Sequence, residues 1–262
     1  MRILVTGASR GIGRAICQRL ARDAAGQVGG KIHLAICASA HPDELDGLAE
    51  ELRALGADVL GLHGDLADAA APQRFIAETV AAFGGLDGLV SNAGIGWVDS
   101  LLGLRLEDWQ RLFDVNLRAT WLLGKAAHPA LKDSRGCIVT IGSMSGVQPQ
   151  VGMGAYSVSK SALIMLSRLM AQEWADDGIR VNCVSPGWVH TPMTADTYAD
   201  ADLKARREAF VPQHRIAEPL ADIAGAVAFF LGPDSGYATG QNLVVDGGLS
   251  DSILKQVPAR KT

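Results

Sequence analysis

The sequence has few cysteines, and those present are far apart. Its 262 residues include only Cys17, Cys37, Cys137 and Cys183, with no CxxC pair and no spacing typical of a metal site. Disulfide frameworks are characteristic of much shorter secreted chains. We therefore expect four small hydrophobic side chains in a core, no bound metal, and a protein of the reducing cytoplasm.

Long hydrophobic runs and basic clusters are also missing. Apolar stretches such as AGAVAFFLG are far shorter than the ~20 residues that cross a bilayer. The N-terminal MRILVTGASRGIG lacks the pattern of a cleaved signal peptide. Lysine and arginine total 24 against 28 acidic residues, a net charge of −4, and no basic run stands out. We therefore expect partners other than membranes and nucleic acids.

Short β-branched segments alternate with longer amphipathic ones along the whole chain. The sequence predicts strands over 2–6, 31–38, 58–62, 86–91, 136–143, 179–185 and 242–245. It predicts helices over 13–23, 43–55, 72–83, 107–131, 155–176 and 220–231, and a less regular stretch over 190–215. This alternation is typical of right-handed crossovers and a mainly parallel sheet covered by helices on both faces. We expect an α/β, doubly wound single domain.

A glycine-rich segment, TGASRGIG, follows the first predicted strand. Gly7, Gly11 and Gly13 have the spacing GxxxGxG rather than the more common GxGxxG. The physical argument is the same: glycines allow a tight turn and a close approach of phosphate, and the helix N-terminus attracts an anion. A glycine turn without any ligand is the alternative interpretation.

The residues around this turn favour NADP(H) over NAD(H). An acidic residue near the end of the second strand usually holds the 2′-hydroxyl of NAD, but AICASAHP (35–42) contains none. Arg10 lies within the glycine turn, where it is placed to face a 2′-phosphate, although an ordinary exposed arginine is the alternative. Asp65 follows the third strand and is a candidate partner for the adenine amino group or, alternatively, a helix N-cap.

Tyr156 and Lys160 lie four residues apart in AYSVSK, on one face of a predicted helix. The chain has only three tyrosines. A free phenol has a pKa of about 10, and a cation within ~4–6 Å lowers such a pKa by about 1–3 units. The pair therefore predicts a proton donor and acceptor tuned by lysine. Ser143 precedes Tyr156 by thirteen residues, at a strand end where substrates bind; a half-buried tyrosine with a solvated lysine is the alternative.

The ordered set of these motifs resembles the short-chain dehydrogenase/reductase family. The set comprises TGASRGIG, SNAG (91–94), VNL around Asn116, Ser143, YSVSK, SPG (185–187) and VDGG near residue 246. It spans about residues 1–249, nearly the whole chain. The resemblance implies a Rossmann-type sheet of seven strands and hydride transfer with a nicotinamide cofactor. It also implies a homo-oligomer, commonly a tetramer joined through its long helices.

The resemblance assigns roles residue by residue. Tyr156 is implied as the acid/base, Lys160 as its partner and ribose ligand, Ser143 as the group that orients the substrate oxygen, and Asn116 as the holder of a relay water. Asn92 to Gly94 are implied to line the adenosine and ribose, and Pro186, Gly187, Val189 and Thr191 to bracket the nicotinamide carboxamide. The expected cofactor-binding residues are Gly7, Ser9, Arg10, Gly11, Ile12, Gly13, Asp65, Leu66, Asn92, Ala93, Gly94, Tyr156, Lys160, Pro186, Gly187, Val189 and Thr191.

The substrate itself is less clearly indicated. The glycine turn and the second-strand ending resemble the 3-oxoacyl-acyl-carrier-protein reductase branch, so a ketone or 3-oxoacyl reductase is expected. We expect residues 188–215, the lid segment, to select the substrate together with 94–98 and 144–153. Its candidate side chains, beside Trp97, are Trp188, His190, Met193, Tyr198, Phe210, His214 and Arg215; subunit or core packing is their alternative role.

Two other functions compete with reduction by NADPH. One is an NAD-dependent alcohol or sugar dehydrogenase, against which the second-strand ending argues. The other is a non-catalytic nucleotide-sensing protein on the same scaffold, against which the complete set Asn116, Ser143, Tyr156 and Lys160 argues. Residues 250–262 form a C-terminal tail beyond the resemblance.

Overall fold

Seven parallel strands form the centre of the protein. The computed structural model describes residues 1–27, 30–96 and 99–252. The sheet has the order β3-β2-β1-β4-β5-β6-β7, and every neighbouring pair is parallel. The strands are β1 Arg2–Thr6, β2 His33–Ala38, β3 Asp58–His63, β4 Gly88–Ser91, β5 Cys137–Ile141, β6 Arg180–Pro186 and β7 Asn242–Val245.

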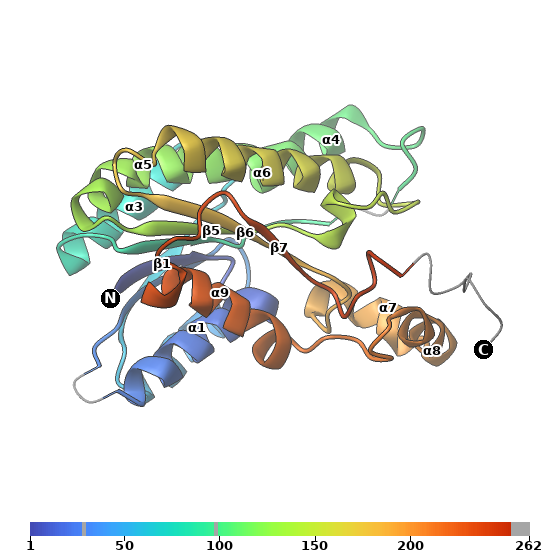
Figure 1. Ribbon diagram of the computed structural model, residues 1–262, viewed down its shortest axis with the longest axis horizontal. Coiled ribbons are helices and arrows are strands. Elements are labelled where there is room, and N and C mark those ends of the chain that lie inside the picture. The colour runs from blue at the N-terminus through green and yellow to red at the C-terminus, as the bar shows by residue number, and fades with distance from the viewer. Residues whose placement is uncertain (28–29, 97–98, 253–262) are drawn as a thin grey trace.

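Helices cover both faces of this sheet (Figure 1). One layer contains α1 (Gly11–Ala25), α2 (Pro42–Ala54) and α9 (Ala224–Leu231), and the other contains α3 (Ala71–Phe83), α5 (Ala119–Ser134) and α6 (Gly154–Glu173). The helices α4 (Leu106–Phe113), α7 (Ala195–Ala199) and α8 (Ala201–Phe210) lie toward one end, beyond the strands. The predicted doubly wound, seven-stranded fold is confirmed.

The apolar strands explain why both faces need cover. In β1, Ile3, Leu4 and Val5 are all fully buried. Alternate side chains of a strand point to opposite faces, so Ile3 and Val5 join the core with α1, α2 and α9, while Leu4 joins the core with α3, α5 and α6. Each hydrophobic layer needs helices on its own side, which requires the crossovers that the alternating sequence predicts.

Several predicted elements differ from the observed ones. The helix expected over 107–131 is α4 and α5 separated by a π-helical turn at Asp114–Arg118, and the helix expected over 220–231 begins with a π turn at Pro219–Ile223. A π-helical turn contains only one residue more than an α-helical turn, so it leaves the spacing of the hydrophobic residues almost unchanged and cannot be predicted from it. The stretch expected to be irregular contains a 3₁₀ turn, Pro192–Thr194, and the helices α7 and α8. The strands β2, β4 and β5 are two or three residues shorter than predicted.

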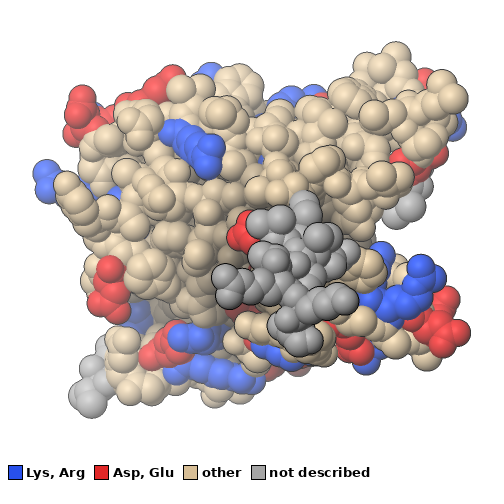
Figure 2. Space-filling model, turned by 45° about the vertical axis from the view of Figure 1, so that its right-hand side comes forward, with Lys and Arg blue, Asp and Glu red and all other residues tan. Residues whose placement is uncertain are grey.

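The surface carries both signs of charge. On the face shown in Figure 2, acidic and basic side chains are interspersed in the lower half and at the right, while uncharged residues make up most of the upper half. No helix among the described residues is long and apolar enough to span a membrane.

An ion pair joins the beginning of β1 to the turn before β4. The carboxylate of Asp87 accepts hydrogen bonds from the Arg2 backbone N–H at 2.7 Å and from Arg2 Nε at 3.1 Å. Burial by itself raises the pKa of Asp87, but the hydrogen bonds from Arg2 outweigh it, and the net pKa is lowered. This carboxylate therefore stabilises the fold when ionised, and that contribution is lost as the pH falls through its lowered pKa.

We expect Asp87→Asn to lower the free energy of unfolding at pH 7 by about 1–3 kcal/mol, because charged hydrogen-bond partners are lost. The difference from the native protein should shrink toward pH 3, because the Asp87 carboxyl of the unfolded native chain, with a pKa of about 3.9, takes up protons there while the folded one resists protonation. Urea unfolding at both pH values measures this. Asp23→Asn, in an exposed pair with Arg19, is the control and should cost less than about 1 kcal/mol. An equal deficit for Asp87→Asn at both pH values would contradict the expectation.

Candidate active site

The glycine turn lies where the strand order reverses, between β1 and β4. In open α/β sheets this crevice, at the carboxyl ends of the strands, is where ligands bind. Gly7 and Gly11 adopt positive φ values of 63° and 59°, a region that glycine enters without penalty. The first amides of α1 follow directly, so the turn presents backbone N–H groups and a helix N-terminus to an anion.

Gly13 has a different role from the other two glycines. Its φ is not positive, but a Cβ at this position would collide with the carbonyl oxygen of Gly7 and lie 2.6 Å from Asn92 Nδ2. The side chain of Asn92 donates to Thr6 O at 2.8 Å and Gly7 O at 3.0 Å. Asn92 therefore fixes the glycine turn from the end of β4, and Gly13 allows α1 to pack closely against both.

The predicted cofactor-selecting residues are exposed near this turn. Arg10 is exposed, has extended backbone angles, and forms no ion pair with any of the described residues. Beyond β2, His41 has a φ of 59° and precedes Pro42, the first residue of α2, with no acidic residue between Ala38 and Pro42. The end of β2 therefore offers no carboxylate, as the sequence predicts.

Asp65 is already engaged by the protein. Its Oδ1 accepts from Ala67 N at 2.9 Å and its Oδ2 accepts from Arg111 Nη2 at 2.9 Å. Burial raises its pKa, but these hydrogen bonds outweigh burial and lower it overall. The N-cap of α3 is Ala70, so Asp65 caps a turn rather than that helix, and the alternative interpretation as a helix N-cap is wrong.

Ser143 and Tyr156 meet at the carboxyl end of β5. Ser143 is 8% exposed, follows β5 by two residues, and accepts from Ser145 N at 3.1 Å. Burial raises the pKa of Tyr156, and a hydrogen bond with the Ser143 hydroxyl acts in the opposite direction. The protein's own groups thus leave the pKa of Tyr156 raised, whereas a lowered value is expected from the sequence. The charge of Lys160 does not offset this effect of burial on the pKa of the phenol.

Lys160 is almost completely buried near the ring of Tyr156, and its ammonium is hydrogen-bonded to the backbone. It is 4% exposed, and its Nζ donates to Ile141 O at 2.8 Å. The same Nζ lies 5.8 Å from the centre of the Tyr156 ring. Burial lowers the pKa of Lys160 to about 8, only partly opposed by the nearby thiol of Cys183. The ammonium is therefore itself close to losing its proton near neutral pH.

Asn116 lies in the π turn between α4 and α5, and π turns often occur at functional sites. Its Oδ1 accepts from Ile95 N at 2.9 Å, and its Nδ2 donates to Ile95 O at 3.0 Å and to Ser159 Oγ at 3.1 Å. A Cβ on Gly94 would lie 3.2 Å from Asn116 Oδ1 and 3.3 Å from Lys160 Nζ. Glycine at this position lets the loop after β4 approach both side chains.

The segment after β6 is fixed by the VDGG motif. A Cβ on Gly187 would meet the Asp246 side chain at 2.5 Å, and Gly187 N donates to Val245 O at 2.9 Å. Val189 is 5% exposed and pairs with Ala217 in a short parallel bridge. Thr191 then begins the 3₁₀ turn, in a capping box with Thr194. Thr191 lies opposite the glycine turn, 3.6 Å from a Cβ built on Gly11.

The lid segment contains an aromatic cluster around one arginine. Arg207 stacks over the rings of Trp188 at 4.9 Å and Tyr198 at 5.6 Å, and His190 packs against Tyr198 at 4.8 Å. Arg215 is committed to a two-point ion pair with Asp222, at 2.6 and 2.7 Å.

Other candidates in the lid segment remain open to solvent. Met193 and Phe210 are 61% and 51% exposed. His214 has a φ of 55° in the turn after α8. The further candidates Trp97 and Val98 lie outside the described residues.

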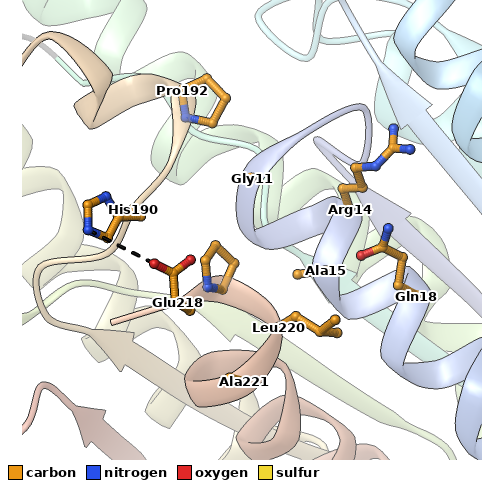
Figure 3. A pocket seen from close by; sticks show the side chains of 10 residues that line it. Gly11, Arg14, Ala15, Gln18, His190, Pro192, Glu218, Leu220 and Ala221 are labelled. Carbon is orange, nitrogen blue, oxygen red and sulfur yellow. Dashed lines mark ion pairs between the residues drawn. The ribbon is translucent and has the colours of Figure 1, made fainter. Parts of the chain in front are cut away.

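A cavity of about 550 Å³ opens beside the glycine turn (Figure 3). Arg14 and Gln18 of α1 line one side, and His190 and Glu218, whose Nε2 and Oε1 are 4.0 Å apart, line the other. None of the four predicted catalytic residues is among its lining residues. The cavity therefore lies beside the glycine turn, away from the four predicted catalytic residues.

Comparisons with known proteins identify the family. A family profile described as enoyl-(acyl carrier protein) reductase matches residues 7–250. The 2,5-dichloro-2,5-cyclohexadiene-1,4-diol dehydrogenase LinX of Sphingobium indicum is 34% identical over 95% of this chain and 96% of its own length. The 3-oxoacyl-[acyl-carrier-protein] reductase FabG of Staphylococcus aureus is 34% identical over 94% and 96%. The chain belongs to the short-chain dehydrogenase/reductase family.

A solved structure agrees with this assignment. The short-chain dehydrogenase from Burkholderia cenocepacia in complex with NADP is 35% identical, covers 95% of this chain and 97% of its own, and has a TM-score of 0.85. The protein is thus a short-chain dehydrogenase/reductase that acts on CH–OH or carbonyl groups with a nicotinamide cofactor.

Several residues that build this short-chain dehydrogenase/reductase site are not evident from the sequence. Thr6 Oγ1 accepts from the backbone N–H groups of Asn92 and Ala93, both at 3.0 Å. Ser159 binds Asn116 from within the YSVSK motif. Ser91 of SNAG shares a 2.8 Å hydrogen bond with Thr120. Hydroxyl groups at buried strand ends signal such contacts, but their partners are distant in sequence and become visible only in the fold.

We expect Lys160→Met to change how the stability of this short-chain dehydrogenase/reductase depends on pH. The folded pKa of about 8 lies below the unfolded value of about 10.4, so the unfolded native chain binds more protons between these pH values. Native stability therefore rises with pH across this window, by up to about 3 kcal/mol, and the variant lacks that rise. Urea unfolding of cofactor-free protein at pH 7.5 and pH 10 measures it.

The advantage of Lys160→Met over the native protein should decrease from the lower pH to the higher. Lys125→Met, on the exposed side of α5, controls for the loss of a lysine as such. If the difference in stability between Lys160→Met and the native protein stayed constant with pH, burial would not lower the pKa of Lys160.

Proposed function

We propose that the protein transfers hydride between NADP(H) and a carbonyl or secondary alcohol, with Tyr156 as the acid/base. The observation that carries the proposal is the arrangement of Ser143, Tyr156 and Lys160 at the carboxyl end of β5, next to the glycine turn. Ser143 and Tyr156 interact directly, and Lys160 is buried beside them.

The residues fit a dinucleotide cofactor. Gly7 and Gly11 have the positive φ angles that expose backbone N–H groups, and α1 supplies a helix N-terminus. Gly94 leaves space beside Lys160 that a Cβ would occupy. The bound nicotinamide supplies or accepts the hydride.

The chain's own residues handle the proton. In the direction of reduction, Tyr156 donates its phenolic proton to the substrate oxygen as that oxygen gains negative charge, and Ser143 donates a hydrogen bond to the same oxygen. The raised pKa of Tyr156 keeps the phenol protonated and ready to donate. Lys160 stabilises the resulting phenolate by its charge. In oxidation the same groups act in reverse.

The preference for NADP(H) rests on Arg10 and the end of β2. Arg10 is exposed at the start of α1 without a carboxylate partner among the described residues, and no acid follows β2 before α2. A guanidinium without a competing acid suits a 2′-phosphate. The NADP complex of the Burkholderia cenocepacia relative supports this assignment.

We propose a ketone or 3-oxoacyl thioester as the substrate class, by analogy with the reductase FabG. The lid segment, residues 188–215, approaches the glycine turn at Thr191 and the loop after β4 at Met193. It also contains the cluster of Trp188, Tyr198 and Arg207. Oxidation of a secondary alcohol is the second candidate, because LinX, a diol dehydrogenase, is equally similar at 34% identity. The protein is first titrated side by side with NADPH and NADH. Assays with a panel of ketones and 3-oxoacyl thioesters and with a panel of secondary alcohols then separate reduction from oxidation.

Other expectations remain predictions. Cytoplasmic location is one, and a homotetramer is another. Large apolar side chains on the outer faces of α5 and α6, among them Trp121, Met165 and Leu169, are exposed by 46–60% and support a subunit contact there. The domain is proposed to end near residue 249. Residues 253–262 of the tail lie outside the described residues.

We expect Tyr156→Phe to lower kcat by about 10²–10⁴-fold, because it removes the proton donor while keeping the ring. The dissociation constant for NADPH should change by less than about threefold, because the Tyr156 hydroxyl is only one of many expected contacts with the cofactor. Steady-state kinetics and a fluorescence titration measure the two quantities. Ketone reduction at an undiminished rate by Tyr156→Phe would end the acid/base assignment.

We expect Arg10→Ala to weaken NADPH binding by about tenfold or more, the typical effect of losing a charge-assisted contact. NADH binding should be affected much less, because NADH lacks the 2′-phosphate. Arg22→Ala, at the other end of α1, is the matched control and should leave both constants unchanged. Equal losses of affinity for NADPH and NADH would contradict the assignment of Arg10.

A further inference from the structure

We propose that Ser159 is a positioning residue that ties the loop after β4 to the helix carrying Tyr156 and Lys160. The inference deepens the proposed function and rests on it, because it concerns the same site. Ser159 immediately precedes Lys160 in YSVSK and is fully buried. It touches neither the reacting groups nor the proposed substrate position, and it acts through Asn116.

The hydroxyl of Ser159 has its two interactions fixed. It donates its single proton to Tyr156 O at 2.8 Å, which leaves its oxygen lone pairs available. Asn116 Nδ2 donates to that oxygen at 3.1 Å. Because the proton is used within α6, the hydroxyl serves Asn116 only as an acceptor. It therefore selects the nitrogen side of the Asn116 amide.

This selection determines what the rest of the Asn116 amide does. With Nδ2 toward Ser159, the second N–H donates to Ile95 O at 3.0 Å and Oδ1 accepts from Ile95 N at 2.9 Å. Both amide protons are then used, and both backbone groups of Ile95 are satisfied. A flipped amide would lose all three hydrogen bonds. The Asn116 side chain is thus a clamp on the Ile95 backbone.

The clamped loop touches the reactive lysine and the lid segment. On one side of Ile95, Gly94 packs so closely that a Cβ would lie 3.3 Å from Lys160 Nζ. On the other side, a Cβ on Gly96 would lie 3.2 Å from Met193 Sδ in the lid segment. Ile95 is therefore the fixed point between these two contacts. Loss of the Ser159 hydroxyl should loosen this loop without removing any group that reacts.

Ser167 provides a matched control on the same helix. It is 1% exposed, donates to Leu163 O at 2.8 Å, and shares a 2.7 Å hydrogen bond with Thr140 Oγ1. Ser167→Ala therefore removes one hydrogen bond within the helix and one to another element, as Ser159→Ala does. It differs in having no connection to Asn116. Effects common to both variants report the general cost of removing a buried hydroxyl.

The test compares the two variants by steady-state kinetics with NADPH and, in purified cofactor-free protein, by hydrogen exchange of peptides containing Ile95. We expect Ser159→Ala to lower kcat by about 5- to 10-fold with less than a twofold change in KM for NADPH, and to speed exchange at residues 93–96. Ser167→Ala should leave kcat and this exchange within twofold of native. Equal effects of both variants, or unchanged exchange in Ser159→Ala, would overturn the proposal.

Two further variants show whether the effect passes through Asn116. In an Asn116→Ala background, Ser159→Ala should cause little additional loss of kcat, because the two residues act as one unit. Ser159→Thr, which keeps the hydroxyl, should recover most of kcat. Additive losses, or a threonine variant that folds but recovers nothing, would contradict the clamp. If Tyr156→Phe instead proved fully active, the acid/base proposal would fail, and the exchange comparison would still decide the role of Ser159.

Discussion

The burial of one ammonium group governs the chemistry of this site. Lys160 lies beneath the carboxyl end of β5 with 4% of its surface exposed, and among the described residues one backbone carbonyl, Ile141 O, accepts from it. Burying a charge without an ionised partner costs free energy and lowers the pKa, here to about 8. The site therefore holds a cation that is only marginally stable as a cation. A negative charge that develops nearby, such as a phenolate, is stabilised most strongly in such an environment.

This constraint also changes how the tyrosine is understood. The spacing of Tyr156 and Lys160 leads to the expectation that the lysine lowers the phenol's pKa. Spacing places both on one face of a helix, but it carries no information on how deeply that face is buried. In the fold, burial raises one pKa and lowers the other. Burial thus favours the neutral form of each group more than water does, but with a pKa of about 8 Lys160 remains mostly protonated at neutral pH, whereas Tyr156 remains neutral.

The architecture was predictable because its determinants are local or periodic. Apolar strands such as Ile3–Val5 and the amphipathic helices between them are sufficient to indicate a doubly wound parallel sheet. The glycine turn was recognisable because Gly7 and Gly11 require positive φ angles. The π turns around Asn116 and Pro219 were not predictable, since one extra residue per turn leaves the hydrophobic pattern almost unchanged. The helices α7 and α8 have no buried residues, so they show no apolar stripe from which a helix could be predicted.

At the site, the sequence indicates which residues gather but not how each uses its hydrogen bonds. Asn92, Asn116 and Asp65 all stand where a ligand contact was expected, yet their side chains bind the protein itself. A side-chain amide whose two N–H donors are both bonded within the protein cannot donate to a cofactor. These residues therefore build the frame, holding the glycine turn, the Ile95 loop and the turn after β3. The residues proposed to recognise the ligands, Arg10 and Tyr156, differ from these: the Arg10 guanidinium is exposed and forms no ion pair within the described residues.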